Sequence, residues 1–124
     1  MANRDVRMVL YQDINFSGRR IQFRRGGVAI RDLRAFRFND ELSSLRLRNV
    51  VSRNQVTLVL FQDINYRGAV RVFRGSQNVA SLIARGFNDE ASSLVVVGRR
   101  LTDRQINNIR NNRRPPQDVL EINQ

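Results

Sequence analysis

The chain has 124 residues and a formal net charge of +11, with 41% hydrophobic and 27% charged residues. This length and composition suit one globular domain and exclude a disordered chain. The sequence contains no cysteine and no histidine, which excludes disulfides, thiolate metal sites and the commonest general base. Any metal site must therefore use oxygen ligands.

All 22 basic residues are arginine. We favour a compositional bias as the explanation. The alternatives are avoidance of amine modification and recognition of anions by the forked guanidinium group. No apolar run reaches the length of a membrane span. Residues 1–5 lack the apolar core of a signal peptide, which favours the cytoplasm unless a leader has been removed.

The first predicted strand covers residues 6–11, which are rich in strand-forming types. It leads into Tyr-Gln-Asp-Ile-Asn-Phe-Ser-Gly at residues 11–18. The same pattern returns as Phe-Gln-Asp-Ile-Asn-Tyr-Arg-Gly at residues 61–68. The final glycine of each copy supplies the backbone geometry that a folded hairpin needs.

Residues 20–24 and 70–74 alternate polar and apolar types, as half-buried strands do. Glycines then turn the chain into two longer connections, residues 28–37 and 77–86. Spaced apolar residues in each connection predict a short helical turn.

An oxygen-rich motif follows each connection, Phe-Asn-Asp-Glu-Leu-Ser-Ser-Leu at residues 38–45 and Phe-Asn-Asp-Glu-Ala-Ser-Ser-Leu at residues 87–94. Amide, carboxylate and hydroxyl oxygens are the ligands that Ca²⁺ selects. Residues 45–48 and 94–97, directly after the motifs, read as the last strand of each unit.

The pattern predicts an all-β domain over residues 5–100, made of repeat one (about 5–50) and repeat two (about 54–98). Each unit of four short strands has an apolar face that it cannot cover alone, so the two form a β-sandwich. The long link before the last strand predicts a Greek key, in which that strand returns beside the first.

The two hairpins and the two Asn-Asp-x-x-Ser-Ser motifs resemble those of the βγ-crystallin family, in its microbial calcium-binding type. Both motifs occur twice and in order, over residues 6–98. The resemblance implies a two-Greek-key β-sandwich that binds two Ca²⁺. In that family the fifth motif position is a hydroxyl ligand, here Ser43 and Ser92. The sixth position, Ser44 and Ser93, hydrogen-bonds the folded hairpin.

A six-residue loop cannot surround an ion that takes six to eight oxygens, so each ion is expected to draw on both loops. Backbone carbonyls of the hairpins are expected to contribute, and Glu41 and Glu90 to act through the carbonyl or the carboxylate. Ser43 is expected to be a loop residue outside the core. The expected metal residues are Asn39, Asp40, Glu41, Ser43, Asn88, Asp89, Glu90, Ser92, Gln12 and Gln62.

The tail, residues 101–124, lies outside the resemblance. The layout Thr102-x-x-Gln105 is that of a capping box and predicts a short helix over 103–112, ended by Pro115 and Pro116. An extended segment follows. The tail either folds back on the domain or frays, or it serves as a partner-binding arm that mediates self-association.

Two functions fit the sequence. The first is a non-catalytic calcium-binding module, because the chain has neither histidine nor cysteine and no serine in a nucleophile elbow. The net positive charge opposes an approaching cation, so moderate affinity is expected. The alternative is an arginine-rich binder of anionic surfaces or nucleic acid, whose Asn-Asp-Glu loops merely satisfy their own backbone.

Overall fold

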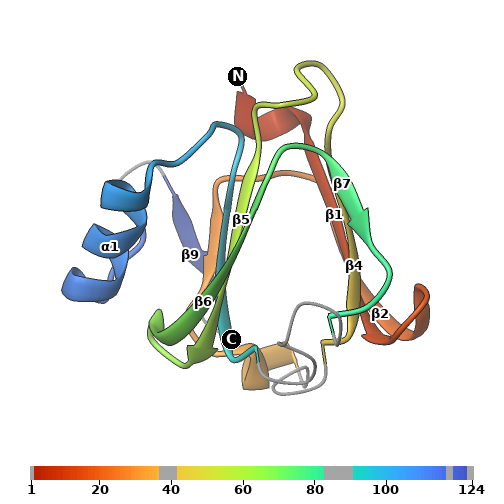
Figure 1. Ribbon diagram of the computed structural model, residues 1–124, viewed down its shortest axis with the longest axis horizontal. Coiled ribbons are helices and arrows are strands. Elements are labelled where there is room, and N and C mark those ends of the chain that lie inside the picture. The colour runs from red at the N-terminus through yellow and green to blue at the C-terminus, as the bar shows by residue number, and fades with distance from the viewer. Residues whose placement is uncertain (1, 37–41, 83–90, 117–118, 123–124) are drawn as a thin grey trace.

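The computed structural model describes residues 2–36, 42–82, 91–116 and 119–122. Two sheets face each other (Figure 1). In spatial order the first holds β2 (Ser17–Phe23), β1 (Val6–Asp13), β4 (Ser44–Asn49) and β7 (Gln77–Val79). The second holds β6 (Arg67–Arg74), β5 (Thr57–Asp63), β8 (Ser93–Val97), β3 (Val28–Ile30) and β9 (Leu120–Ile122). Helical turns η1 (Ala2–Asp5) and η2 (Leu33–Phe36) and helix α1 (Asp103–Asn112) complete the described elements.

The predicted Greek keys are confirmed, because the last strand of each repeat pairs with its first. β4 lies antiparallel to β1, with Leu10 opposite Leu45. β8 lies antiparallel to β5, with Leu60 opposite Leu94. Each long link therefore returns the chain to the strand from which its repeat began.

The connections hold more structure than the expected helical turn. Residues 28–30 form β3, which pairs with β8 in the sheet of the other repeat, and η2 follows it. β7 likewise pairs with β4 in the first sheet. Each repeat thus gives its third strand to the other, so the sheets are completed only when both repeats fold together.

Alternate residues of both sheets point into the space between them. The alternation places the apolar side chains on the inner face, where burial supplies the main stabilisation. Fully buried examples are Met8, Leu10, Leu45, Leu58, Leu60 and Leu94.

The tail helix occurs where the capping box predicts it. The Gln105 backbone N–H donates to Thr102 Oγ1 at 3.1 Å, and the Thr102 N–H donates to Gln105 Oε1 at 2.8 Å. Ile106 and Ile109 of α1 are buried against the outer face of the second sheet (Figure 1). β9 then runs parallel to β3, so the tail folds back on the domain. No helix in the described residues has the length and apolarity to cross a membrane.

Candidate metal sites

The hairpin β1–β2 and the hairpin β5–β6 share an unusual backbone at their tips. Asn15 and Phe16 have φ near +58°, and Asn65 and Tyr66 have φ of +59° and +60°. Two successive residues with positive φ are typical of the tight turn that matches strand twist. Asparagine tolerates this region, whereas an aromatic residue there is strained, so the tips need outside support.

Ser44 and Ser93 provide that support. The Ser44 hydroxyl accepts from the Phe16 backbone N–H at 3.0 Å and donates to the Asp13 carbonyl at 2.5 Å. The Ser93 hydroxyl makes the same two bonds in the second repeat, from Tyr66 N–H at 3.1 Å and to the Asp63 carbonyl at 2.6 Å. The sixth motif position therefore holds the folded hairpin, as the resemblance implied.

Ser43 and Ser92 lie directly beneath the hairpins. The Ser43 N–H donates to the Tyr11 carbonyl at 3.0 Å, and the Ser92 N–H donates to the Phe61 carbonyl at 2.9 Å. Ser43 is only 5% exposed and Ser92 only 6%. Ser43 lies in the loop before β4 and outside the hydrophobic core, as expected, but it is buried, because strand pairing and the other repeat's connection enclose it.

The two repeats interleave at these positions. The Leu82 N–H donates to the Ser43 carbonyl at 2.9 Å, and the Leu33 N–H donates to the Ser92 carbonyl at 2.8 Å. The hairpin tips follow the same rule, since Asn65 N–H donates to the Arg31 carbonyl at 2.8 Å. Each candidate site thus combines one repeat's hairpin and serines with the other repeat's connection.

A surface hollow of about 480 Å³ opens beside Ser92. Asp63 and Asn65 of the hairpin tip line it together with Ser92, so a carboxylate, an amide and a hydroxyl gather there. Arg34 of η2 and Arg67 of β6 also line the hollow. The Arg34 guanidinium lies 2.7 Å from Asp32 Oδ2, and its hydrogen bonds to Asp32 lower the pKa of that carboxyl.

Sequence reasoning missed Asp63 and its counterpart Asp13 as candidate site residues. Both end the first strand of a hairpin, and a Cβ added at Gly18 or Gly68 would collide with these carboxylates. The signal was available, because Gln-Asp-Ile-Asn is unchanged between the repeats although its carboxylate packs against no apolar core.

The remaining predicted residues divide into two groups. Gln12 is half-buried and Gln62 exposed, each one residue before the carboxylate that ends its strand. The other six lie outside the described residues, so their part in a site stays a prediction: Asn39, Asp40, Glu41, Asn88, Asp89 and Glu90. Within residues 2–36, 42–82, 91–116 and 119–122, no three acidic side chains come together as a metal cluster.

The donor chemistry at the hollow fits a hard cation. Carboxylate, amide carbonyl and hydroxyl oxygens are calcium ligands, whereas no imidazole or thiolate exists in the chain to favour a transition metal. Arg34 and Arg67 oppose a cation there, although the charge of Arg34 is paired with Asp32.

Solved structures with the same fold belong to the βγ-crystallins. A structure titled for the evolution of the eye-lens βγ-crystallin domain fold matches with a TM-score of 0.63 and 26% identity, over 78% of this chain and 88% of that one. A βγ-crystallin from Ciona intestinalis matches with a TM-score of 0.57 and 22% identity, over 72% and 96%. An archaeal βγ-crystallin matches with a TM-score of 0.54 and 20% identity, over 77% and 98%. No family model and no curated protein matches the sequence.

Proposed function

We propose that this chain, a βγ-crystallin domain by its fold, is a non-catalytic module that binds two calcium ions. One ion lies beside Ser92 and the other beside Ser43. The observation that carries the proposal is the hollow in which Asp63, Asn65 and the buried Ser92 meet. Oxygen donors of three kinds, held on strand ends and a locked hairpin, are what Ca²⁺ requires.

The repeat supplies the second site. Asp13 and Asn15 occupy the positions of Asp63 and Asn65, and the same serine hydrogen bonds hold both hairpins. In this proposal the acidic loop residues of the two motifs add negative charge and further oxygens: Asp40, Glu41, Asp89 and Glu90. Because each site includes a connection from the other repeat, calcium at either site fastens the repeats together.

The proposal that the module is non-catalytic rests on the residue types in the chain. Neither a histidine nor a cysteine exists to act as base or nucleophile. The structures that share this fold are crystallin domains, and the candidate carboxylates are assigned here to a cation.

Calorimetric titration of metal-stripped protein with Ca²⁺ tests the proposal. Two binding events per chain are expected, and a ligand that binds only the folded state stabilises it by about 2.7 kcal/mol per site at a hundredfold excess over Kd. The melting temperature should therefore rise in Ca²⁺ more than in Mg²⁺, which demands strict octahedral geometry. Absence of heat, with equal melting temperatures in chelator, Ca²⁺ and Mg²⁺ at matched ionic strength, would leave the loops a purely structural role.

Single-site variants assign the ions. Ser43→Ala and Ser92→Ala should each abolish one binding event and keep the other, since each removes one hydroxyl. Ser43→Arg would also have to bury a guanidinium at a position only 5% exposed, so alanine is the cleaner change. Ser52→Ala is the matched control, because Ser52 lies exposed in the connection between β4 and β5, away from both hairpins. Two unchanged binding events in both site variants would show that the serine hydroxyls are not ligands.

A further inference from the structure

The outer faces of the two sheets carry opposite chemistry. On β8 of the second sheet, Val95 and Val97 point outward and are buried beneath α1. The same positions of β4 are Arg46 and Arg48, and both are exposed. The outer face of the first sheet is therefore open and basic at the positions where the second sheet is apolar and covered.

The first strands differ in the same way. Thr57 of β5 is buried, and its hydroxyl donates to the Arg99 carbonyl and accepts from the Leu101 N–H, which ties the tail to the second sheet. The equivalent residue of β1 is Arg7. A helix covers the outer face of the second sheet. The fold therefore does not require the outer face of the first sheet to be bare and charged.

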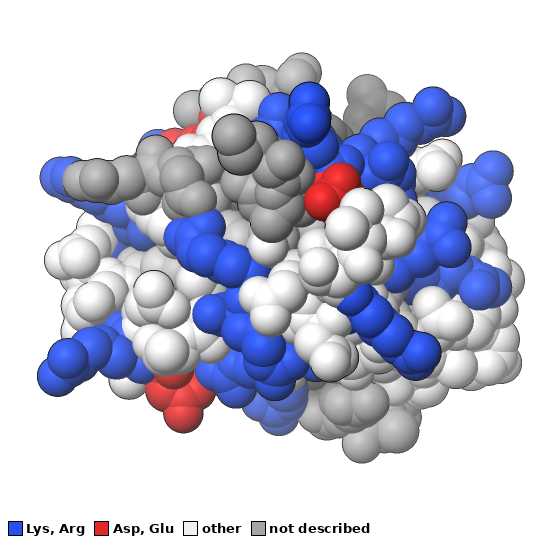
Figure 2. Space-filling model, turned by 90° about the horizontal axis from the view of Figure 1, so that it is seen from above, with Lys and Arg blue, Asp and Glu red and all other residues white. Residues whose placement is uncertain are grey.

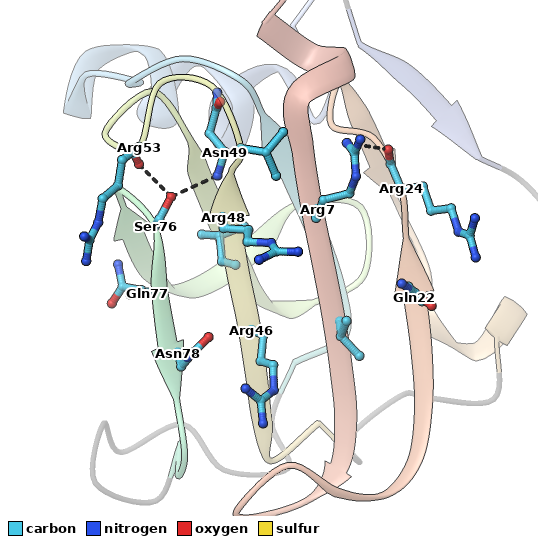
Figure 3. Close-up of a pocket in the computed structure, with 13 residues that line it drawn as sticks. Arg7, Gln22, Arg24, Arg46, Arg48, Asn49, Arg53, Ser76, Gln77 and Asn78 are labelled. Atoms are coloured by element: carbon cyan, nitrogen blue, oxygen red, sulfur yellow. Dashed lines mark hydrogen bonds between the residues drawn. The ribbon is translucent and has the colours of Figure 1, made fainter.

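The strand register lines the arginines up across the first sheet. Arg7 lies directly opposite Arg48. Arg24, one residue beyond β2, extends the row on the other side, and its carbonyl accepts from Arg7 Nη1 at 2.9 Å (Figure 3). Like charges directly opposite each other destabilise a sheet, so this row opposes folding unless an anion neutralises it.

These arginines line a groove of about 950 Å³ on the open face. In Figure 3, Arg46 and Arg48 project from β4 in front of the sheet, with the amides of Gln77 and Asn78 on β7 beside them. No acidic residue lines the groove in the part of the chain that the structure describes, and the arginines seen there in ion pairs, Arg31, Arg34 and Arg74, lie outside the groove. The arginines of the groove are Arg7, Arg24, Arg46, Arg48 and Arg53.

Two of the arginines are held in place without losing their charge. The Arg46 guanidinium lies 4.0 Å from the centre of the Phe16 ring. Arg7 Nη1 donates to the carbonyls of Arg4 and Val6 as well as that of Arg24. A preorganised cation loses less side-chain entropy when it binds an anion.

We propose that this groove binds the phosphate backbone of double-stranded nucleic acid. The guanidinium fork matches phosphate oxygens in geometry and charge, and the neighbouring amides are further donors. No aromatic side chain lines the groove in the described residues, so the stacking platform of single-strand binders is missing. A concave surface suits a rod-shaped polymer better than a flat bilayer.

Arginines are spread over the face that Figure 2 shows, and the exposed Arg104 and Arg110 of α1 lie outside the groove. The net charge of +11 would by itself attract any polyanion. The test must therefore separate the groove from the overall charge, and variants of equal charge on opposite faces do this.

The first measurement is fluorescence anisotropy of a labelled DNA duplex titrated with the full chain, in calcium and in chelator. We expect a Kd of roughly 10⁻⁴ to 10⁻⁶ M at physiological salt, as for sequence-independent binding. If all five arginines of the groove contact phosphates, the slope of log K against log salt should be about −4 to −5. Binding should not need calcium, so this result and the calcium titration can fail independently.

The decisive comparison is between two double variants. Arg46→Gln with Arg48→Gln removes two charges from the groove and should lower the magnitude of the salt slope by about two, with an affinity loss of about tenfold or more at low salt. Arg104→Gln with Arg110→Gln removes the same charge from exposed positions of α1 and should change affinity by about twofold or less. Melting curves of both variants establish that each is folded.

Three results would overturn the proposal. Equal losses in both double variants would mean that net charge alone attracts the duplex. Tighter binding of a single strand of the same sequence would point to stacking at another site. Binding to anionic phospholipid vesicles without binding to the duplex would assign the groove to a membrane surface, with exposed Val50, which lines the groove, and its neighbour Val51 as the inserting residues.

Discussion

Arg34 and Arg67 make the two repeated sites unequal. Both line the hollow beside Ser92, whereas the aligned residues of the other repeat, Ile83 and Ser17, are uncharged. A guanidinium near a cation site lowers affinity by Coulomb repulsion, weakened by solvent and salt. The proposed site at Ser92 should therefore be the weaker of the two.

Arg34→Gln tests this inequality. Loss of the guanidinium also releases the Asp32 carboxylate to which it is bonded, so Ca²⁺ affinity at the weaker site should rise by roughly two- to fivefold. Calorimetry would record the two affinities moving closer together. Arg104→Gln serves as the control for net charge, and an unchanged or weaker second affinity in Arg34→Gln would contradict the prediction.

Tyr66 links the second hairpin to the tail. Its hydroxyl donates to Glu121 Oε2 at 2.6 Å, and Glu121 also lies 3.8 Å from Arg31. Burial, and then the bond to Glu121, raise the pKa of Tyr66 above its ordinary value of 10.0. The folded chain thus keeps this proton where the unfolded chain loses it, so stability is complete below about pH 10 and falls as the pH rises above it.

Tyr66→Phe should remove both the hydrogen bond to Glu121 and the titrating group with the raised pKa. The loss of a hydrogen bond to a charged group should lower the free energy of unfolding at neutral pH by about 1.5 to 3 kcal/mol. The free energy of unfolding should then fall less steeply above pH 10 than it does in the wild type. Urea unfolding at neutral and alkaline pH measures both, with Tyr11→Phe as the control because phenylalanine already occupies the equivalent position 61. A parallel alkaline decline in wild type and Tyr66→Phe would refute the assignment.

At the scale of the elements, the pairing of β1 with β4 places Arg7 opposite Arg48. A neutral residue at position 48 removes one like-charge contact, so Arg48→Gln should stabilise the free protein at low salt by about 0.2 to 1 kcal/mol. Added salt should narrow the difference because it screens exposed charges. A substitution that stabilises the fold while weakening duplex binding is typical of a functional surface.

Thermal melts at several salt concentrations measure the effect of Arg48→Gln. Arg110→Gln is the matched control, since it removes the same charge in the last turn of α1, where positive charge is favourable. The control should be neutral or destabilising. Destabilisation by Arg48→Gln at low salt would mean that the guanidinium contributes packing that outweighs the repulsion.

For the whole molecule, the tail is the third layer of the fold. Leu101, Ile106 and Ile109 are buried against the outer face of the second sheet, and each such burial contributes about 1.5 to 3 kcal/mol. Their sum is a large share of the roughly 5 to 15 kcal/mol that stabilises a typical domain. The apolar valines of β5 and β8 would be exposed without them.

Removal of residues 101–124 should therefore destabilise the domain severely and cause self-association through the uncovered face. Light scattering and urea unfolding measure the two effects. A chain ending at residue 116 keeps α1 and loses β9, and it should keep the oligomeric state of the full chain with a smaller loss of stability. A chain of residues 1–100 that keeps the stability and the oligomeric state of the full chain would show that the tail is dispensable.

Local chemistry determined much of this protein. Matching turn motifs predicted both hairpins, and the capping box predicted α1. The apolar alternation with a long link predicted the return of β4 to β1. Ser44 and Ser93 act on hairpins of their own repeats, and the resemblance was enough to predict them. Each of these features depends on residues close in sequence or on a repeated pattern, so the sequence could reveal it.

Only the tertiary structure decided which segments meet across the repeats. Strands of three residues, such as β3 and β7, are too short to show a period, so their exchange between sheets was invisible. The burial of Ser43, the position of Arg34 beside Ser92, and the arginine row depend on that exchange and on strand register. Register and sheet partners are fixed by contacts between residues far apart in the chain, and a local pattern does not specify them.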